Sequence, residues 1–367
     1  MTRSTIGIAI LVLLTALMVA DVSAHGLRVI DGFMLGFKAR LDHPDRRSAE
    51  HLRDGVLTAG PGLSVLEVNT GTASIQIIGA DTGEIRVNYR VRVLASDPAQ
   101  AVLHAKTIMV ALTADGDRGR LTVTEPPTRP SPVGGVEVDL LVQVPRGLAL
   151  EVDAAYELTI RGAGSTRAHN FGPTVIEDLQ GDLVATVTVG SLRVNGVSGS
   201  ATVEAQGGHV VLINVGGAVQ VDARVASRAE IRDVGGGLSG HFLGGSLEVS
   251  GVRGEVGIQS RLTHISLRDV GGPADIGSTY GGVTFFGPVE DVCIRGAGSH
   301  IRILLRPEAG YRVQASVSHG FFSSDFPLEV TREDSTDHAE GTIGDGAKIL
   351  DVINSMGSVE IRSLVGN

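Results

Sequence analysis

Cysteine and tryptophan are the scarcest residues of this chain. Its 367 residues include one cysteine, no tryptophan, four tyrosines and nine phenylalanines. A single thiol excludes an intramolecular disulfide, so the fold must be held together by burial of apolar surface. Because large aromatic rings are rare, valine, leucine, isoleucine and alanine must fill the core, which suits a narrow interior. Glycine, in contrast, is abundant, with 50 residues.

Clusters of basic residues are also lacking. Lysine and arginine total 31 against 41 aspartates and glutamates, and the formal net charge is −10. A nucleic-acid partner requires a basic footprint, and a single strand also requires stacking aromatic rings. The sequence shows neither, so we expect no nucleic acid among the partners.

The first 24 residues have the pattern of an export signal. Arg3 precedes an apolar run from Ile6 to Ala20, and Val22-Ser23-Ala24 then forms a small-x-small cleavage pattern. The apolar run is shorter than the roughly 20 residues that cross a bilayer. We therefore expect a signal peptide over 1–24 and export to the periplasm, the outer surface or the extracellular space. Membrane attachment would follow only if this leader is not cleaved.

The next two regions differ in their periodicity. Residues 25–60 have mixed charge and no sustained period, which predicts a polar linker or stalk with a faint helical pattern near Arg47 to Leu57. Residues 61–145 alternate between apolar and polar side chains, as β-strands do. Within them, Ser96-Asp97-Pro98 predicts the start of one short helix. This region is expected to form a small strand-rich cap.

A short phrase of a branched apolar residue followed by glycine two positions later recurs along the middle of the chain. The spacings between successive phrases are 18, 18, 19, 18 and 18 residues, and a seventh, degenerate copy starts at Val289 after a further 19. The phrases are Leu179-Gln180-Gly181, Val197-Ser198-Gly199, Val215-Gly216-Gly217, Val234-Gly235-Gly236, Val252-Arg253-Gly254 and Val270-Gly271-Gly272.

Each repeat has five expected inward positions. With the valine or leucine as position 0, apolar residues recur at −5, −3, 0, +4 and +6, and 31 of the 35 positions in seven repeats are apolar. Two alternating groups separated by a turn predict two short strands per repeat, with the glycine at +2 supplying a turn angle that other residues resist. The exceptions are Thr174, Gly240, Thr284 and Arg295.

One repeat cannot bury its own apolar side chains, so the coils must stack. We expect a single-stranded, all-β solenoid with about 18 residues per coil over residues 146–310. The aromatic stretch Phe321 to Phe326 and the last strands of region 311–363 are expected to cap its far end, because unpaired strand edges invite association.

Three phrases resemble those of the putative-adhesin or toastrack-type β-solenoid domains of bacterial cell envelopes. They are the residues 67–75, the segment Val144-Pro145-Arg146-Gly147-Leu148 and the residues 354–361. The resemblance extends over residues 65–361 and implies an adhesin-like role at the envelope, in some members linked to envelope stress, with no catalytic residues. The chain departs from this pattern in its longer stalk and in Asp291, which stands where the repeat has glycine.

Two sets of polar residues could suggest chemistry. His209 and His264 share position −6 but should lie three coils apart, too far to ligate one metal ion. Asp178, Asn214, Asp233 and Asp269 share position −1. Asp233 and Asp269 should lie two coils apart, near 9.6 Å by strand spacing. That separation approaches the distance between the carboxyl groups of an inverting glycosidase, but turn residues that bond nearby backbone are the stronger interpretation.

Cys293 and the phenylalanines of the C-terminal region are the remaining candidates. Cys293 falls at position +4 and is expected to be buried and inert, unless Asp291 shifts the register so that the residues on either side of Cys293 point inward. Phe321, Phe322 and Phe326 are expected to cap the solenoid, with an adhesive tip as the alternative. No catalytic, cofactor-binding or metal-binding residue is assigned, and no cofactor is expected.

Three functions remain open from the sequence. The first is a non-enzymatic, adhesin-like interaction or scaffold module that presents a rigid face to an envelope protein or glycan. The second is a polysaccharide-active β-helix enzyme that uses Asp233 and Asp269. The third is a sensory or regulatory partner in envelope stress, which rests on the family resemblance alone.

The register predicts that Val215→Asp unfolds several coils or the whole solenoid, because the substitution places an unpaired charge in the core. The far-ultraviolet circular dichroism spectrum and the melting temperature would report this loss. Unchanged values for both would show that position 0 does not point inward.

Overall fold

The structure is a computed structural model that describes residues 49–126, 133–225 and 228–364. These residues belong to two compact units, called unit 1 and unit 2. The signal peptide expected over 1–24, and the part of the linker before residue 49, lie outside the described residues.

Unit 1 comprises, within the described part of the chain, residues 49–52, 92–107 and 133–136. It contains the helix α3 (Pro98–Thr107). The backbone N–H of Ala99 donates a hydrogen bond of 3.0 Å to the Asp97 carboxylate, so the predicted cap forms at the predicted place. No helix among the residues that the structure describes has the length and apolar content to span a bilayer.

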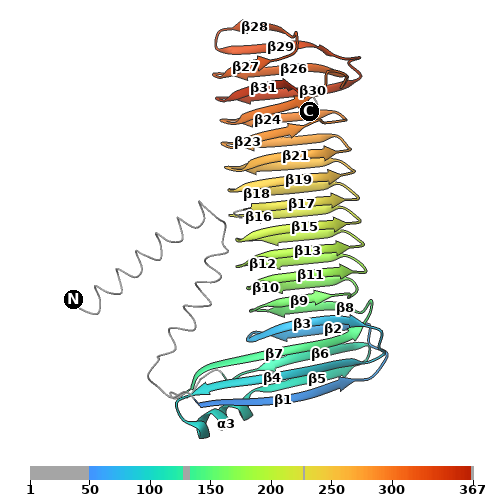
Figure 1. Cartoon of the computed structure of the whole chain (residues 1–367), viewed down its shortest axis with the longest axis vertical. Helices are drawn as coiled ribbons and strands as arrows, with labels where there is room; N and C mark the ends of the chain where they lie inside the picture. Colours follow the sequence, from blue (N-terminus) through green and yellow to red (C-terminus); the bar gives the residue numbers. More distant parts are fainter. Residues whose placement is uncertain (1–48, 127–132, 226–227, 365–367) are drawn as a thin grey trace, which may run out of the picture. The chain divides into compact units, whose positions relative to one another are not determined.

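Unit 2 is built from two long sheets, A and B, whose strands are mostly parallel (Figure 1). Strands β1, β4 and β7 have residues in both units. Sheet A has the order β1 (Ala49–Ala59), β4 (Ile85–Ala95), β7 (Val133–Pro145), β3 (Ala73–Ala80), β9 (Leu158–Arg161), β11 (Thr174–Leu179), β13 (Leu192–Val197), β15 (His209–Val215), β17 (Arg228–Val234), β19 (Ser246–Val252), β21 (His264–Val270), β23 (Gly282–Phe286), β25 (His300–Leu305), β31 (Ser358–Ser363) and β27 (Phe321–Ser324). Sheet B has the order β28 (Glu329–Glu333), β29 (Thr336–Ile343), β26 (Tyr311–Ser318), β30 (Lys348–Ser355), β24 (Val292–Ala297), β22 (Ala274–Thr279), β20 (Val256–Arg261), β18 (Leu238–Leu243), β16 (Val219–Arg224), β14 (Ala201–Ala205), β12 (Leu183–Val187), β10 (Thr166–Asn170), β8 (Ala149–Ala154), β2 (Val65–Thr70), β6 (Arg118–Thr124) and β5 (Met109–Asp115).

The predicted all-β solenoid is confirmed, with one strand of sheet A and one of sheet B in each coil. Position 0 forms a continuous ladder in which Val197 pairs with Leu179 on one side and with Val215 on the other. These side chains are 1–2 % exposed, as are their counterparts Val234, Val252 and Val270. The inward positions predicted from the repeat therefore form the core.

The seventh repeat begins one residue earlier than predicted. Pro288, not Val289, is the buried residue at position 0, and Val289 is 48 % exposed. When the repeat is counted from Pro288, positions −5 and −3 are Val283 and Phe285. Positions +4 and +6 are then Val292 and Ile294. All four are buried. Two of the four apparent exceptions, Thr284 and Arg295, thus came from the wrong starting residue.

The prediction that the glycine at +2 supplies an unusual turn angle is wrong. None of the six repeat glycines has a positive φ, whereas position −1 of every repeat does. The residues at −1 are Asp178, Gly196, Asn214, Asp233, Gly251, Asp269 and Gly287, with φ values from 51° to 80°. Asparagine and aspartate tolerate this left-handed conformation better than other residues with side chains.

The +2 glycines are required by the close approach of one coil to the next. A Cβ atom added to Gly272 would lie 2.5 Å from the carbonyl carbon and oxygen of Gly254 in the preceding coil. The backbone N–H of Gly254 donates a hydrogen bond of 3.0 Å to the carbonyl of Gly236, so the ladder continues through the turns. A side chain at +2 would push these turns apart.

Near both ends of the coil stack, strands pair with strands that are not their neighbours in the sequence. Strand β2 pairs with β6 and β8, and β3 pairs with β7 and β9. At the other end β30 lies between β24 and β26, and β31 between β25 and β27. The last strands of the chain, expected as an end cap, are therefore inner strands. The terminal strand of sheet B is instead β28.

Residues 49–59 were predicted to belong to a polar linker with a faint helical pattern. This prediction is wrong, because they form strand β1. From His51 to Ala59 partly buried and exposed residues alternate strictly. That period of two was hidden in the sequence because polar side chains and Gly55 occupy several of the partly buried positions.

Gly272→Ala is expected to lower the free energy of unfolding by about 1–3 kcal/mol, because the added methyl group meets backbone that cannot move without separating two coils. Gly257→Ala is the matched control, since nothing lies within 4 Å of a Cβ atom at that position and its φ is not positive. Urea denaturation of both variants measures the difference. Equal midpoints would contradict this role of the +2 glycine.

Candidate functional site

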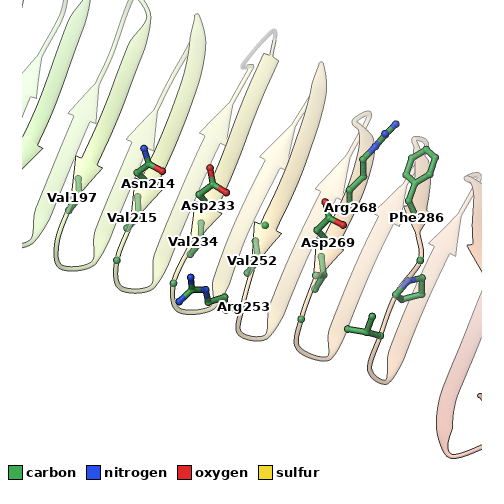
Figure 2. Close-up of a pocket in the computed structure, with 18 of the residues that line it drawn as sticks. Val197, Asn214, Val215, Asp233, Val234, Val252, Arg253, Arg268, Asp269 and Phe286 are labelled. Atoms are coloured by element: carbon green, nitrogen blue, oxygen red, sulfur yellow. The ribbon is translucent and has the colours of Figure 1, made fainter. Parts of the chain in front are cut away.

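A groove of about 1420 Å³ follows one edge of the coil stack in unit 2 (Figure 2). It lies where each strand of sheet A ends and the chain turns into sheet B, and positions −1, 0 and +1 of successive coils line it. Figure 2 shows Asn214, Asp233 and Asp269 on the same side of their coils. The groove therefore repeats once per coil, about every 4.8 Å.

Missing side chains make this edge hollow. Position +1 is glycine in three coils, at Gly216, Gly235 and Gly271, and each of these residues lines the groove. Position −1 is glycine at Gly196, Gly251 and Gly287. A Cβ atom added to Gly251 would lie 2.9 Å from Oδ1 of Asp233, and Gly196 lies in the same way against Asp178, so these two glycines leave room for the carboxylate of the coil before.

The aspartates at −1 are exposed and unpaired. Within the described part of the chain, Asp178, Asp233 and Asp269 form no side-chain hydrogen bond or ion pair. Asn214 donates a hydrogen bond of 3.0 Å to the side-chain oxygen of Asn195. The expectation that the aspartates bond nearby backbone is therefore wrong, and their left-handed φ accounts for their place in the turn.

Cations gather near the C-terminal end of the groove. Arg253, Arg268, Arg306 and Lys348 line it, and the Arg268 guanidinium lies 3.9 Å from the centroid of the Phe286 ring. None of these arginines has a carboxylate partner among the described residues. A cation held over an aromatic face is oriented and still able to bind an anion.

The arrangement does not resemble the glycosidase pair. Asp233 and Asp269 lie at the same ladder position two coils apart, with Gly251 between them, as predicted. Both are exposed. The carboxyl groups of a glycosidase flank the scissile bond of a bound sugar, whereas these two lie on solvent-exposed turns.

The pair of histidines that lies closest on sheet A is not the pair considered from the sequence. His209 and His264 are three coils apart on sheet A, with Arg228 and Ser246 between them. His264 lies closer to His300, because only Gly282 separates them in the ladder. No group of three or more possible ligands for a metal ion occurs in the described ranges. The one-residue shift at Pro288 had hidden the relation between His264 and His300.

Cys293 is half-buried and points away from the core, so its predicted burial is wrong. Its neighbours Val292 and Ile294 are the inward pair, as the alternative register required. Burial is the largest cause that raises the pKa of this thiol, and the Asp351 carboxylate 3.9 Å away raises it further. Arg295 acts in the opposite direction.

The phenylalanine stretch forms the last strand of sheet A. Phe321 begins β27 and is 77 % exposed, while Phe322 and Phe326 are partly buried. Strand β27 pairs only with β31. The stretch thus ends the sheet as predicted, but Phe321 itself is not used for burial.

The solved structures that resemble this chain share little sequence identity with it and have low TM-scores. No family model matches the chain, and no curated protein sequence matches it. A "putative cell adhesion protein" from Clostridium sporogenes is 11% identical with a TM-score of 0.20, covering 85% of this chain and 100% of its own. A "putative adhesin" from Parabacteroides distasonis is 12% identical with a TM-score of 0.27, covering 85% and 97%. The toastrack-type family suggested by the sequence stays a prediction.

The raised pKa of Cys293 predicts slow alkylation near neutral pH, because the thiolate is the reactive form. Asp351→Asn should lower that pKa and speed alkylation by iodoacetamide at pH 7.5, because it removes a carboxylate that disfavours the thiolate. Arg295→Gln should change the rate in the opposite direction. Mass spectrometry of timed samples measures both, and equal rates in all three chains would contradict this assignment.

Proposed function

We propose that this protein is a non-enzymatic, adhesin-like interaction module that presents the edge groove to an extended partner at the cell envelope. The groove carries the proposal, because positions −1, 0 and +1 of successive coils line it along the stack from Asp178 to Asp269. A partner of extended shape, either an envelope glycan or a protein chain, fits such a surface.

The solenoid suits this role because the backbone of the groove is hydrogen-bonded from each coil to the next. Each wall residue belongs to a turn held by hydrogen bonds to the coil before it, such as Gly235 N–H to the Val215 carbonyl at 2.8 Å. A preformed site loses little conformational freedom on binding. Unpaired carboxylates along the groove and arginines toward its end supply polar contacts that do not first have to break an ion pair.

Location at the envelope rests on the leader pattern of residues 1–24 and on the resemblance of three phrases to envelope solenoids. The proposal needs no cofactor and no catalytic residue. Asp233 and Asp269 serve in it as hydrogen-bond acceptors for the partner.

Binding of the mature chain to envelope fractions and to a glycan array tests the proposal. Ser198→Arg should weaken binding several-fold, because it adds a long cationic side chain to the groove wall at position +1, where Arg253 shows that the fold accepts an arginine. Ser239→Arg, on the exposed face of β18, is the matched control and should bind as the wild type does. No binding by the wild type, or equal binding by both variants, would remove the groove from consideration.

A further inference from the structure

A column of exposed apolar side chains lies at the edge opposite the groove, where the strands of sheet B end and the chain turns into sheet A. Each member but the last donates a backbone hydrogen bond to the residue that precedes the next member: Leu262 N–H donates to the carbonyl of Thr279 at 2.9 Å, and Tyr280 N–H to that of Ala297 at 2.8 Å. We call this column the ridge. Its members are Val225, Gly244, Leu262, Tyr280, Gly298, Met356 and His319.

Every ridge residue has a left-handed backbone, with φ between 52° and 82°. This conformation is unfavourable for residues with a side chain, and most of all for a β-branched residue such as Val225. Gly244 and Gly298 show that glycine fits the same position. The fold alone therefore does not require the large residues at Val225, Leu262 and Tyr280.

The apolar ridge side chains are solvent-exposed. Val225 is 71 % exposed, Met356 58 %, and Leu262 and Tyr280 55 % each. None of these four side chains lines the groove or the three smaller hollows described on unit 2. The ridge is thus a strip of exposed apolar groups outside these four hollows, about 24 Å long from Val225 to Met356 at one strand spacing per coil.

Buried polar side chains hold the ridge turns rigid. The hydroxyl of Thr263 donates to backbone carbonyls that include that of Arg261 at 3.1 Å. Ser299 donates to the Ser278 carbonyl at 2.9 Å, and the Asn354 amide donates to the Ser299 carbonyl at 2.9 Å. These hydrogen bonds hold the turns that present the ridge side chains, and the Tyr280 ring lies over Gly298 of the next coil.

Acidic residues are absent from these turns although the chain carries 41 of them. The segments 243–246, 261–264, 279–282, 297–300, 318–321 and 355–358 contain no aspartate or glutamate, and neither does Arg224-Val225. Arg261 has no ion-pair partner within the described part of the chain. Arg224, the other arginine of these segments, is paired with Asp222 at 2.9 Å. Among the described residues, the ridge edge therefore combines apolar side chains with one unpaired arginine, Arg261, while the groove edge carries unpaired carboxylates.

We propose that the ridge docks the solenoid sideways onto an anionic lipid surface. Apolar side chains enter the boundary between headgroups and acyl chains, and Arg261 meets a lipid phosphate, as in amphipathic surface binders. A lipid surface needs no complementary pocket, whereas a protein partner needs about 800 Å² per side with pockets for its anchors. Docking here would leave the groove, on the opposite edge, facing away from the membrane.

Co-sedimentation with vesicles tests this inference on the mature chain. Vesicles of phosphatidylcholine with 30% phosphatidylglycerol should bind it, and vesicles of phosphatidylcholine alone should bind it several-fold more weakly, about fivefold per engaged cation. The double variant Leu262→Gly/Tyr280→Gly should lose at least tenfold in binding. Its melting temperature should not fall, because glycine relieves the left-handed backbone at both positions.

Two further variants make the outcome decisive. Arg261→Glu should weaken binding to the anionic vesicles alone, and Val330→Ser, which removes a 50 % exposed valine from β28, should bind as the wild type does. Equal binding by wild type and double variant, or no binding to anionic vesicles at low salt, would overturn the proposal. So would a dimer in solution that the double variant abolishes, since a second copy would then cover the ridge. Ser198→Arg should bind vesicles normally, which separates this test from that of the groove.

Discussion

This structure depends on how closely the backbone of each coil packs against that of the next. Turn backbone touches turn backbone at position +2, where Gly254 and Gly272 leave no room for even a methyl group. This approach lets N–H and carbonyl groups pair through the turns as well as along the strands. Each coil therefore buries its apolar residues only against its neighbours, and the array is stable as a stack rather than coil by coil.

The same stacking places two kinds of left-handed residue in continuous columns, one at each edge. The groove column consists of glycine, aspartate and asparagine, and a carboxylate such as that of Asp233 lies over the glycine of the next coil. The ridge column combines glycine with large apolar residues such as Leu262 and Tyr280. One backbone geometry thus carries two surfaces of different character, which we assign to different partners.

The ends of the array are closed by segments that leave and re-enter the ladder. At the C-terminal end, β30 and β31 enter beside β24 and β25, and β26 stacks beyond them. Tyr311 of β26 is buried, and its hydroxyl donates to the carbonyl of Glu290, the residue at +2 in the repeat that lacks the glycine. The edge strand β28 has charged residues, among them Glu329, Arg332 and Glu333, which discourage pairing with another sheet.

Much of the solenoid was readable from the sequence, because a period of two within a period of 18 is a local property that every coil repeats. The five inward positions and the helix start at Asp97 were predicted at the correct residues. The repeat starting at Val289 was misplaced by one residue, since proline at position 0 does not look like the branched residues above it. That error misplaced Cys293 and concealed how near His264 and His300 lie.

The sequence by itself determined the class of fold, the repeat length and the residues of the core, because burial and strand alternation leave a local pattern. Only the tertiary structure decided why the glycines are needed, which coils are neighbours at the two ends, and that scattered residues form a groove and a ridge. Those features depend on contacts between residues 18 or more positions apart, such as Gly254 with Gly272. No local pattern reports such contacts until the coils are stacked.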